Sequence, residues 1–183
     1  MLKFIVMNKK RIYVIGPSGS GKTYLAKIIS KQFGIPHTNL DYVFFDHKVS
    51  KSRDEVSDEE WKRRLNKLIR EDSWIIEGVN PINEVFEIAD QIIFLRLNIV
   101  ETLVSQWKRY LTDEKQRREH GFINNLKLSR YLIKQHTEEE NLLKSNDPKY
   151  FRVKKVDRIL KSYSDKTLIL KSRSEVNKFI ETL

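Results

Sequence analysis

Residues 16–23 read Gly16-Pro17-Ser18-Gly19-Ser20-Gly21-Lys22-Thr23. This run matches the pattern G-x-x-x-x-G-K-[ST] at every fixed position. Glycine permits backbone angles that other residues rarely adopt, so consecutive N–H groups can turn inward around a phosphate. The lysine adds a full positive charge for the β- and γ-phosphates, and the threonine hydroxyl is a ligand for Mg²⁺. The run therefore predicts a loop that binds ATP through its phosphates, together with Mg²⁺.

The segments on either side of this loop favour the same interpretation. Arg11–Ile15 (RIYVI) is a short run of strand-forming residues that ends at the loop. Lys22–Phe33 carries apolar residues at helical spacing, and Gly34 and Pro36 end that helix. A helix that begins beside Lys22 directs the positive end of its dipole at a bound anion. The motif thus lies between a strand and a helix, as a phosphate-binding loop requires.

Strand and helix signals alternate along most of the remaining chain. Four further strands are expected at His37–Leu40, Trp74–Glu77, Gln91–Leu97 and Thr167–Leu170. Three further helices are expected at Ser57–Glu71, at about Val100–Leu111 and at Ser174–Leu183. Ser57 and Glu60 form a capping box at the start of the first of these helices. This alternation predicts an α/β fold in which helices cover both faces of a parallel sheet.

The segment Thr112–Lys149 departs from the alternation, since it is highly charged and separates the fourth expected strand from the fifth. We expect it to be mostly helical, from about Phe122 to Leu143, and to project as a flap. A chain of 183 residues fits one domain that carries such an insertion. We therefore expect a single domain over residues 1–183, with a helical lid insertion at 112–149.

The composition excludes several kinds of protein and site. Hydrophobic residues make up 39% of the chain, which is enough for a core. The absence of cysteine excludes disulfides, thiolate zinc sites and a cysteine nucleophile, and it fits a reducing cytosol. No stretch approaches the roughly 18 to 20 apolar residues that span a bilayer, and the N-terminal apolar run is too short for a signal peptide. We expect a cytoplasmic protein with no membrane partner.

The positive charge is concentrated in the C-terminal half. The formal net charge is +10; residues 1–104 contain 16 Lys and Arg against 14 Asp and Glu, whereas residues 105–183 contain 19 against 11. Such a basic surface can attract nucleic acid, or it can attract ATP and a second phosphorylated substrate. It is equally compatible with a well-solvated lysine-rich surface. Composition does not choose among these interpretations.

Two carboxylates are candidates for metal binding and proton transfer. Asp41 follows the second expected strand and Glu77 closes the third, so both are expected at the sheet edge where the phosphate loop lies. A carboxylate there can hold Mg²⁺, and Asp41 can accept a proton from an acceptor hydroxyl. The alternatives are an N-cap or turn aspartate at 41 and an ordinary strand-ending turn at 77.

Four arginines are candidates for contacts with the nucleotide. Phosphoryl transfer spreads negative charge over equatorial oxygens, and guanidinium groups carried by a closing flap stabilise that charge. Arg109 is expected on the helix that leads into the flap, and Arg117 and Arg118 in the flap itself. Arg173 follows the fifth expected strand and is a candidate for the pocket of the nucleotide base. A surface position is equally compatible with each of them.

Four segments carry a family resemblance. They are residues 12–45 (IYVIGPSGSGKTYLAKIISKQFGIPHTNLDYVFF), 74–80 (WIIEGVN), 89–97 (ADQIIFLRL) and 168–183 (LILKSRSEVNKFIETL). Through them the chain resembles the small P-loop kinases of the adenylate kinase and shikimate kinase type. Within these it most resembles the bacterial topology modulation proteins, also described as FlaR-related. The resemblance implies a three-layer P-loop NTPase fold with a five-stranded parallel sheet, an ATP site and a lid.

The resemblance also assigns roles to matching residues. It implies that Lys22 and Thr23 hold the triphosphate and Mg²⁺, and it matches Asp41 to the acidic residue after the second strand. Glu77 falls where many nucleoside monophosphate kinases have an aspartate, in a segment that contains a substrate-binding arginine. Here residues 77–81 read EGVNP, and no arginine follows.

Three functions are compatible with these observations. The first is a kinase that transfers the γ-phosphate of ATP to a small-molecule or nucleotide acceptor, with Asp41 orienting or deprotonating the acceptor. The second is a nucleotide-dependent, topology-modulating module whose basic C-terminal half binds nucleic acid, although no nucleic-acid-binding motif is recognisable. The third is a slow ATPase without an acceptor, which the missing arginine after Gly78 favours.

Overall fold

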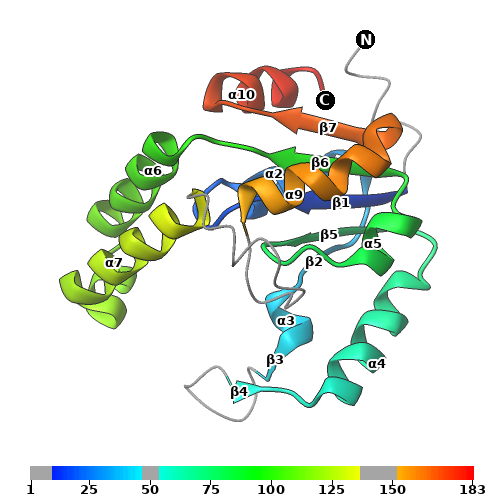
Figure 1. Ribbon diagram of the computed structural model, residues 1–183, viewed down its shortest axis with the longest axis horizontal. Helices are drawn as coiled ribbons and strands as arrows, with labels where there is room; N and C mark the ends of the chain where they lie inside the picture. The colour runs from blue at the N-terminus through cyan, green and yellow to red at the C-terminus, as the bar shows by residue number, and fades with distance from the viewer. Residues whose placement is uncertain (1–9, 47–53, 137–151) are drawn as a thin grey trace.

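A five-stranded sheet forms the centre of the computed structural model, which describes residues 10–46, 54–136 and 152–183 (Figure 1). The strand order is β2-β5-β1-β6-β7, and each neighbouring pair is parallel. The five strands are β1 (Arg11–Ile15), β2 (His37–Asn39), β5 (Trp74–Gly78), β6 (Gln91–Leu95) and β7 (Thr167–Leu170). A separate antiparallel pair consists of β3 (Phe45–Asp46) and β4 (Asp54–Glu55). The predicted five-stranded parallel sheet is confirmed.

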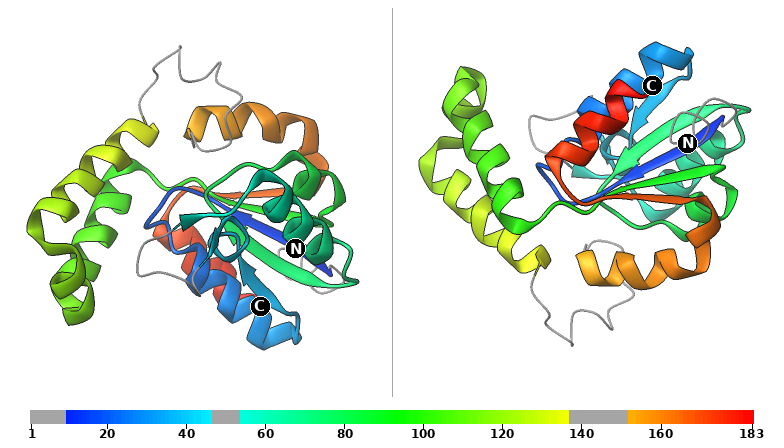
Figure 2. Two further views of the ribbon diagram at one scale, coloured as in Figure 1. Left: turned by 90° about the horizontal axis from the view of Figure 1, so that it is seen from below. Right: turned by 90° about the horizontal axis from the view of Figure 1, so that it is seen from above.

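Side chains that alternate along each strand supply two cores, one on each face of the sheet. In β1, Ile12 and Val14 enter one core, whereas Tyr13 and Ile15 enter the other. The first core is covered by α2 (Lys22–Phe33) and α10 (Arg173–Glu181). The second is covered by α3 (Asp41–Phe44), α4 (Asp58–Ile69), α5 (Asn83–Ile88) and α9 (Val153–Leu160). Figure 2 shows these helices on opposite sides of the sheet, which makes three layers.

Two long helices stand apart from these layers. They are α6 (Ile99–Thr112) and α7 (Glu114–His136), and they lie side by side beyond the end of the sheet (Figures 1 and 2). α7 begins earlier than the expected Phe122 and changes direction at Gly121, where φ is 61°. Residues 137–143 of the expected helix, and 137–149 of the expected lid, lie outside the described residues.

Side-chain hydrogen bonds hold the starts of α4 and β1. The Ser57 hydroxyl accepts a hydrogen bond from the Glu60 amide at the start of α4, as the capping box predicts. Asp90 lies before β6, and its Oδ2 accepts bonds from the amides of Lys10 and Arg11, both at 3.0 Å. This aspartate therefore secures the edge of the sheet opposite the phosphate loop.

The structure also contains elements that the periodicity did not predict. These are α3, α5, α9, the β3–β4 pair and a 3₁₀ segment (Lys161–Lys166) that leads into β7. β6 ends at Leu95, two residues earlier than expected, and the next residue, Arg96, pairs with Asp157 of α9 at 2.9 Å. Across the described residues no helix combines the length and the apolar character needed to cross a membrane.

Candidate active site

The loop between β1 and α2 has the backbone geometry that a bound phosphate requires. Gly19 and Gly21 have φ values of 79° and 94°, in the region where a side chain is strained. Gly21 is the N-cap of α2 and no side chain caps this end, so the first N–H groups of the helix are available to an anion. The loop lies at the carboxyl end of the central strand, where ligands of open α/β sheets bind.

The side chain of Lys22 lies inside this loop. Its side chain is buried, and Nζ donates a hydrogen bond to the Pro17 carbonyl at 2.9 Å. Burial lowers the pKa of Lys22 to about 8, although the carboxylates of Glu77 and Asp41 act in the opposite direction. A phosphate beside Nζ would favour the charged ammonium, so the lysine is placed to exchange its carbonyl partner for a phosphate oxygen.

A buried carboxylate faces the start of α2. Glu77 is 1% exposed, and its Oε1 accepts hydrogen bonds from Thr23 Oγ1 at 2.8 Å and from Asn39 Nδ2 at 2.5 Å. The His37 ring lies 3.9 Å from the same oxygen, and burial lowers the pKa of this histidine. Thr23 and Glu77 thus place a hydroxyl and a carboxylate oxygen side by side.

These oxygen donors fit Mg²⁺, which is commonly bound by one or two carboxylates together with substrate phosphates. Within the described residues no group of three or more histidine, aspartate or glutamate side chains is placed to hold a metal ion. Phosphate oxygens and water would therefore complete the coordination if Thr23 and Glu77 are ligands. This is the arrangement expected at a phosphate-binding loop.

A cavity of about 670 Å³ lies beside the loop and has two walls. From the loop and the strand ends come Lys22, Thr23, Asn39, Asp41 and Glu77. From α6 and α7 come Gln106, Arg109, Tyr110, Asn124 and Asn125, together with two leucines. The cavity therefore joins the phosphate loop to a mainly polar surface of the two projecting helices.

The structure brings some of the predicted site residues together at this cavity. Ser18, Gly19, Gly21, Lys22 and Thr23 line it from the loop, whereas Gly16, Pro17 and Ser20 belong to the loop without lining the cavity. Asp41 is the first residue of α3, and its amide donates to Asn39 Oδ1 at 2.7 Å. Asp41, Glu77 and Arg109 all line the cavity, as a shared site requires.

The other predicted arginines lie elsewhere. Arg117 and Arg118 are exposed near the start of α7 and are not among the cavity-lining residues, and Arg118 pairs with Glu114 at 2.5 Å. Arg173 does not line the cavity either. Its Nη2 donates to the Gly19 carbonyl at 2.9 Å and to Ser105 Oγ at 2.6 Å, so it contacts the loop itself.

Sequence reasoning missed the polar contacts between α6 and α7. Gln106 Nε2 donates to the backbone carbonyl and to Oδ1 of Asn125, both at 2.7 Å, and Ser129 Oγ donates to Gln106 Oε1 at 3.0 Å. All three side chains are buried. Gln106 precedes Arg109 by about one helical turn, so both lie on the same face of α6. The sequence signal that could have identified Gln106 is this position on the face of the predicted arginine.

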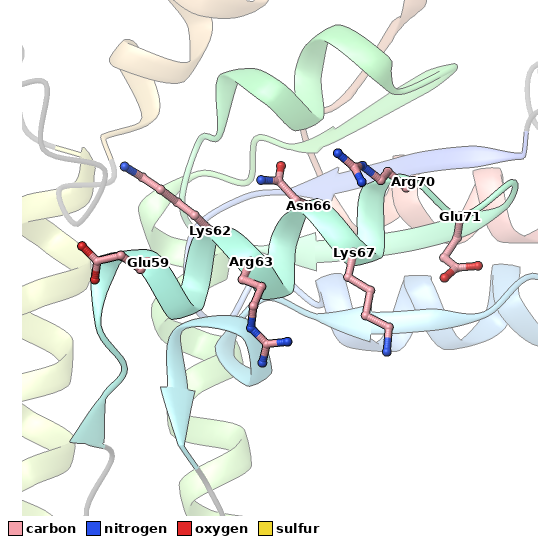
Figure 3. A pocket seen from close by; sticks show the side chains of 7 residues that line it. All are labelled: Glu59, Lys62, Arg63, Asn66, Lys67, Arg70 and Glu71. Atoms are coloured by element: carbon pink, nitrogen blue, oxygen red, sulfur yellow. The ribbon is translucent and has the colours of Figure 1, made fainter.

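A second hollow, of about 640 Å³, lies along α4 and has a different character. Figure 3 shows that its lining side chains all come from α4 and the turn that follows it. Most of them are charged, and two of them are Arg63 and Lys67. No residue of the phosphate loop takes part, so this hollow is a groove on the charged surface of one helix.

Comparisons with solved structures show the shared fold. The chain is similar to the shikimate kinase of Bacteroides thetaiotaomicron, with 13% identity, a TM-score of 0.50 and coverage of 94% of this chain and 95% of that chain. It is also similar to a gluconokinase of Sinorhizobium meliloti 1021, with 13% identity, a TM-score of 0.50 and coverage of 94% and 88%. At such identities the likeness concerns the fold alone. The curated proteins contain no match.

The comparison with protein-family models identifies the chain at a broader level. One model, described as ATPase family associated with various cellular activities (AAA), matches residues 12–126. This range includes the phosphate loop, both carboxylates and all of α6, and it makes up more than half of the sequence. The chain therefore belongs to the family of ATPases associated with various cellular activities (AAA).

Proposed function

We propose that this protein is a kinase that uses ATP and Mg²⁺ to phosphorylate a small-molecule acceptor. One observation carries the proposal: the phosphate loop and Asp41 line the same cavity as the polar surface of α6 and α7. An ATPase without an acceptor needs space for a water molecule beside the nucleotide, whereas this cavity, of about 670 Å³, extends from the loop to the side chains of α6 and α7. The nucleotide phosphates take the part beside the loop, and the part beside α6 and α7 can take a second substrate.

In the proposed reaction, Asp41 accepts the proton of an acceptor hydroxyl while the hydroxyl oxygen forms a bond to the γ-phosphorus. The bond from the γ-phosphorus to the bridging oxygen breaks, and ADP leaves with the electron pair. Lys22 and Arg109 neutralise the charge that spreads over the phosphoryl oxygens. Thr23 and Glu77 would hold Mg²⁺, which supplies further charge neutralisation when it is bound.

The charge of the cavity favours an acceptor with few negative groups. Among the described lining residues, Arg109 is the one cationic side chain besides Lys22. The segment EGVNP lacks the arginine that nucleoside monophosphate kinases use, and Val79 lines the cavity there. The amide of Asn124, which lines the cavity from α7, suits a hydroxyl group. We therefore favour a neutral or singly charged hydroxylated acceptor over a nucleoside monophosphate.

We also propose that the chain is one kinase-like domain in which α7 forms the described part of a lid insertion at residues 112–149, and α6 leads into it. α6 carries Arg109 on the same wall of the cavity as Asn125 of α7. Closure of this pair onto the loop would bring the guanidinium to the phosphates and exclude water.

The other two functions have less support. The resemblance to topology modulation proteins suggests a role with DNA, but no contact or comparison described above supports nucleic-acid binding. An ATPase without an acceptor agrees with the family but leaves the polar wall of α6 and α7 unexplained. Both become outcomes of the experiment that follows.

The test measures ADP release with Mg²⁺ and a panel of acceptors, with the product identified by mass spectrometry. Shikimate and gluconate enter the panel because two kinases of this fold carry their names; sugars, nucleosides and nucleoside monophosphates complete it. We expect one hydroxylated acceptor to raise the rate and to gain a phosphate. ADP release that is indifferent to every acceptor would contradict the proposal and favour the ATPase.

Three variants test which residues take part in the reaction. Lys22→Ala should lower the rate by a factor of about 100 or more, because it removes the charge at the β- and γ-phosphates. Asp41→Asn should keep nucleotide affinity and lower transfer by a factor of about 10² to 10⁴. Asp90→Asn is the matched control, since this aspartate bonds to amides at the opposite edge of the sheet. It should leave the rate unchanged.

A further inference from the structure

The carbonyl groups of the phosphate loop need hydrogen-bond donors behind the loop. When consecutive N–H groups point inward, the neighbouring carbonyls point away from the phosphate, and buried carbonyls require partners. The Pro17 carbonyl accepts from Lys22 Nζ at 2.9 Å and from the Ser20 amide at 3.2 Å. The Gly19 carbonyl accepts from Arg173 Nη2 at 2.9 Å.

Nucleotide binding affects these two donors, Lys22 Nζ and Arg173 Nη2, in different ways. Lys22 must turn from the Pro17 carbonyl toward the phosphates to perform its proposed role. Arg173 is not among the residues that line the cavity, so its bond to Gly19 can persist while the nucleotide is bound. Arg173 is therefore placed to hold the loop in both states.

The same guanidinium joins three parts of the chain that lie far apart in sequence. Arg173 is the first residue of α10, and its Nη2 also donates to Ser105 Oγ of α6 at 2.6 Å. Its backbone amide donates to Glu101 Oε1, also in α6, at 3.1 Å. Nη1 lies 2.6 Å from the position that a Cβ on Gly21 would occupy, so the guanidinium packs directly against the loop.

We infer that Arg173 is a positioning residue for the phosphate site. Its bond to the Gly19 carbonyl fixes the orientation of the loop amides. Its bonds to Ser105 and Glu101 fix the position of the first turns of α6 relative to those amides. The following turn of α6 carries Gln106 and Arg109 into the cavity. This inference rests on the proposed nucleotide binding, and it differs from the base contact that the sequence predicted for Arg173.

Calorimetric titration with two ligands separates positioning from base contact. The ligands are a non-hydrolysable ATP analogue and inorganic triphosphate, each with Mg²⁺, added to the wild-type chain and to Arg173→Met. Loss of a charge-assisted hydrogen bond to the loop should weaken both ligands by about tenfold, because both depend on the same amides. Arg173→Lys should restore part of the affinity. A loss for the ATP analogue alone would overturn the inference in favour of base contact.

Arg96→Met is the matched control for a general loss of stability. Arg96 is also a partly buried, bonded arginine, and it pairs with Asp157 at 2.9 Å away from the loop. This variant should unfold at a lower temperature and bind triphosphate as the wild type does. If Arg173→Met shows the same behaviour, with triphosphate affinity within twofold of wild type, the role of Arg173 is structural and the inference fails.

Two further variants keep the test decisive if Arg173→Met does not fold. Arg173→Gln retains a shorter donor, and Ser105→Ala removes one partner of Nη2 while it leaves the arginine in place. We expect triphosphate to bind about three- to tenfold more weakly to the former and about two- to threefold more weakly to the latter. Unchanged affinity in both would overturn the inference. Absence of binding to the wild-type chain would instead contradict the proposed function itself.

Discussion

The sheet around the phosphate loop buries mainly apolar side chains, whereas the α6–α7 pair buries mainly polar ones. Around the loop, β1 contributes four fully buried apolar residues, and α2 adds Leu25 and Ile29. α7 instead buries mainly polar side chains, Asn125, Ser129 and Gln135, and it leaves large apolar ones exposed. Phe122 is 59% exposed and Ile123 is 70% exposed. The two regions that form the cavity are therefore held by different forces.

This difference indicates which region is rigid and which can move. Apolar burial contributes about 1.5 to 3 kcal/mol for each large side chain, and many such side chains support the loop. A hydrogen bond contributes only about 0.5 to 1.5 kcal/mol net, and a few of them join α6 to α7. Segments with few buried apolar contacts open first. We expect the sheet to fix the phosphates and the helix pair to move.

The largest expected effect comes from a methyl group in the loop. Gly21→Ala places a side chain at φ 94°, with its Cβ only 2.6 Å from the Arg173 guanidinium, so nucleotide affinity should fall by a factor of about 100 or more. Gly34→Ala is the control: Gly34 ends the same helix at φ 68°, and a Cβ there meets nothing within 4 Å.

Calorimetry and thermal unfolding distinguish the two glycine variants. Gly34→Ala should lower the free energy of unfolding by about 1 kcal/mol through backbone strain and leave nucleotide affinity unchanged. Equal losses of affinity in both variants would show that the whole of α2, and not the loop, limits binding.

A smaller effect is expected from the contacts between the helices. Gln106→Leu leaves Asn125 and Ser129 buried without this partner, which costs about 1 to 3 kcal/mol. Hydrogen exchange of the α7 amides should accelerate by a factor of about 10 to 100, whereas the amides of β1 keep their rate. Equal acceleration in β1 and α7 would show that the molecule opens as one cooperative unit, contrary to the comparison above.

Ile123→Ser tests the outer face of the same helix. Because this side chain is 70% exposed, its replacement should change the free energy of unfolding by no more than about 0.5 kcal/mol. A large loss of stability would mean that this face has a partner in solution.

The last prediction concerns protons at Lys22. Its pKa is about 8 in the folded chain against an ordinary value of 10.5, so the unfolded state binds more protons between these values and stability should rise with pH across that window. Lys22→Met should abolish this rise. A bound triphosphate favours the ammonium form, so binding at pH 9 should take up a fraction of a proton. Calorimetry in two buffers of different ionisation enthalpy measures that uptake; identical enthalpies would contradict it.

Much of the fold could be predicted because its signals are local. β1 and α2 have the predicted bounds, since a strand buried on both faces is uniformly apolar and Gly34 ends the helix in a left-handed conformation. α5 and α9 were not predicted because they have only six and eight residues, too few for a clear period. α7 was misjudged at its start, since its charged first turns carry no apolar stripe.

The amino-acid sequence by itself determined the phosphate loop, because its eight residues are contiguous and their backbone preferences act locally. It also placed Asp41 and Glu77 at the correct edge, since parallel strands end together. Only the tertiary structure decided that Arg109 lines the cavity, that Arg117 and Arg118 do not, and that Arg173 holds Gly19. Gly19 and Arg173 are 154 residues apart, and no local propensity encodes such a contact. It forms because the packing of the sheet and helices brings both ends of the chain to one point.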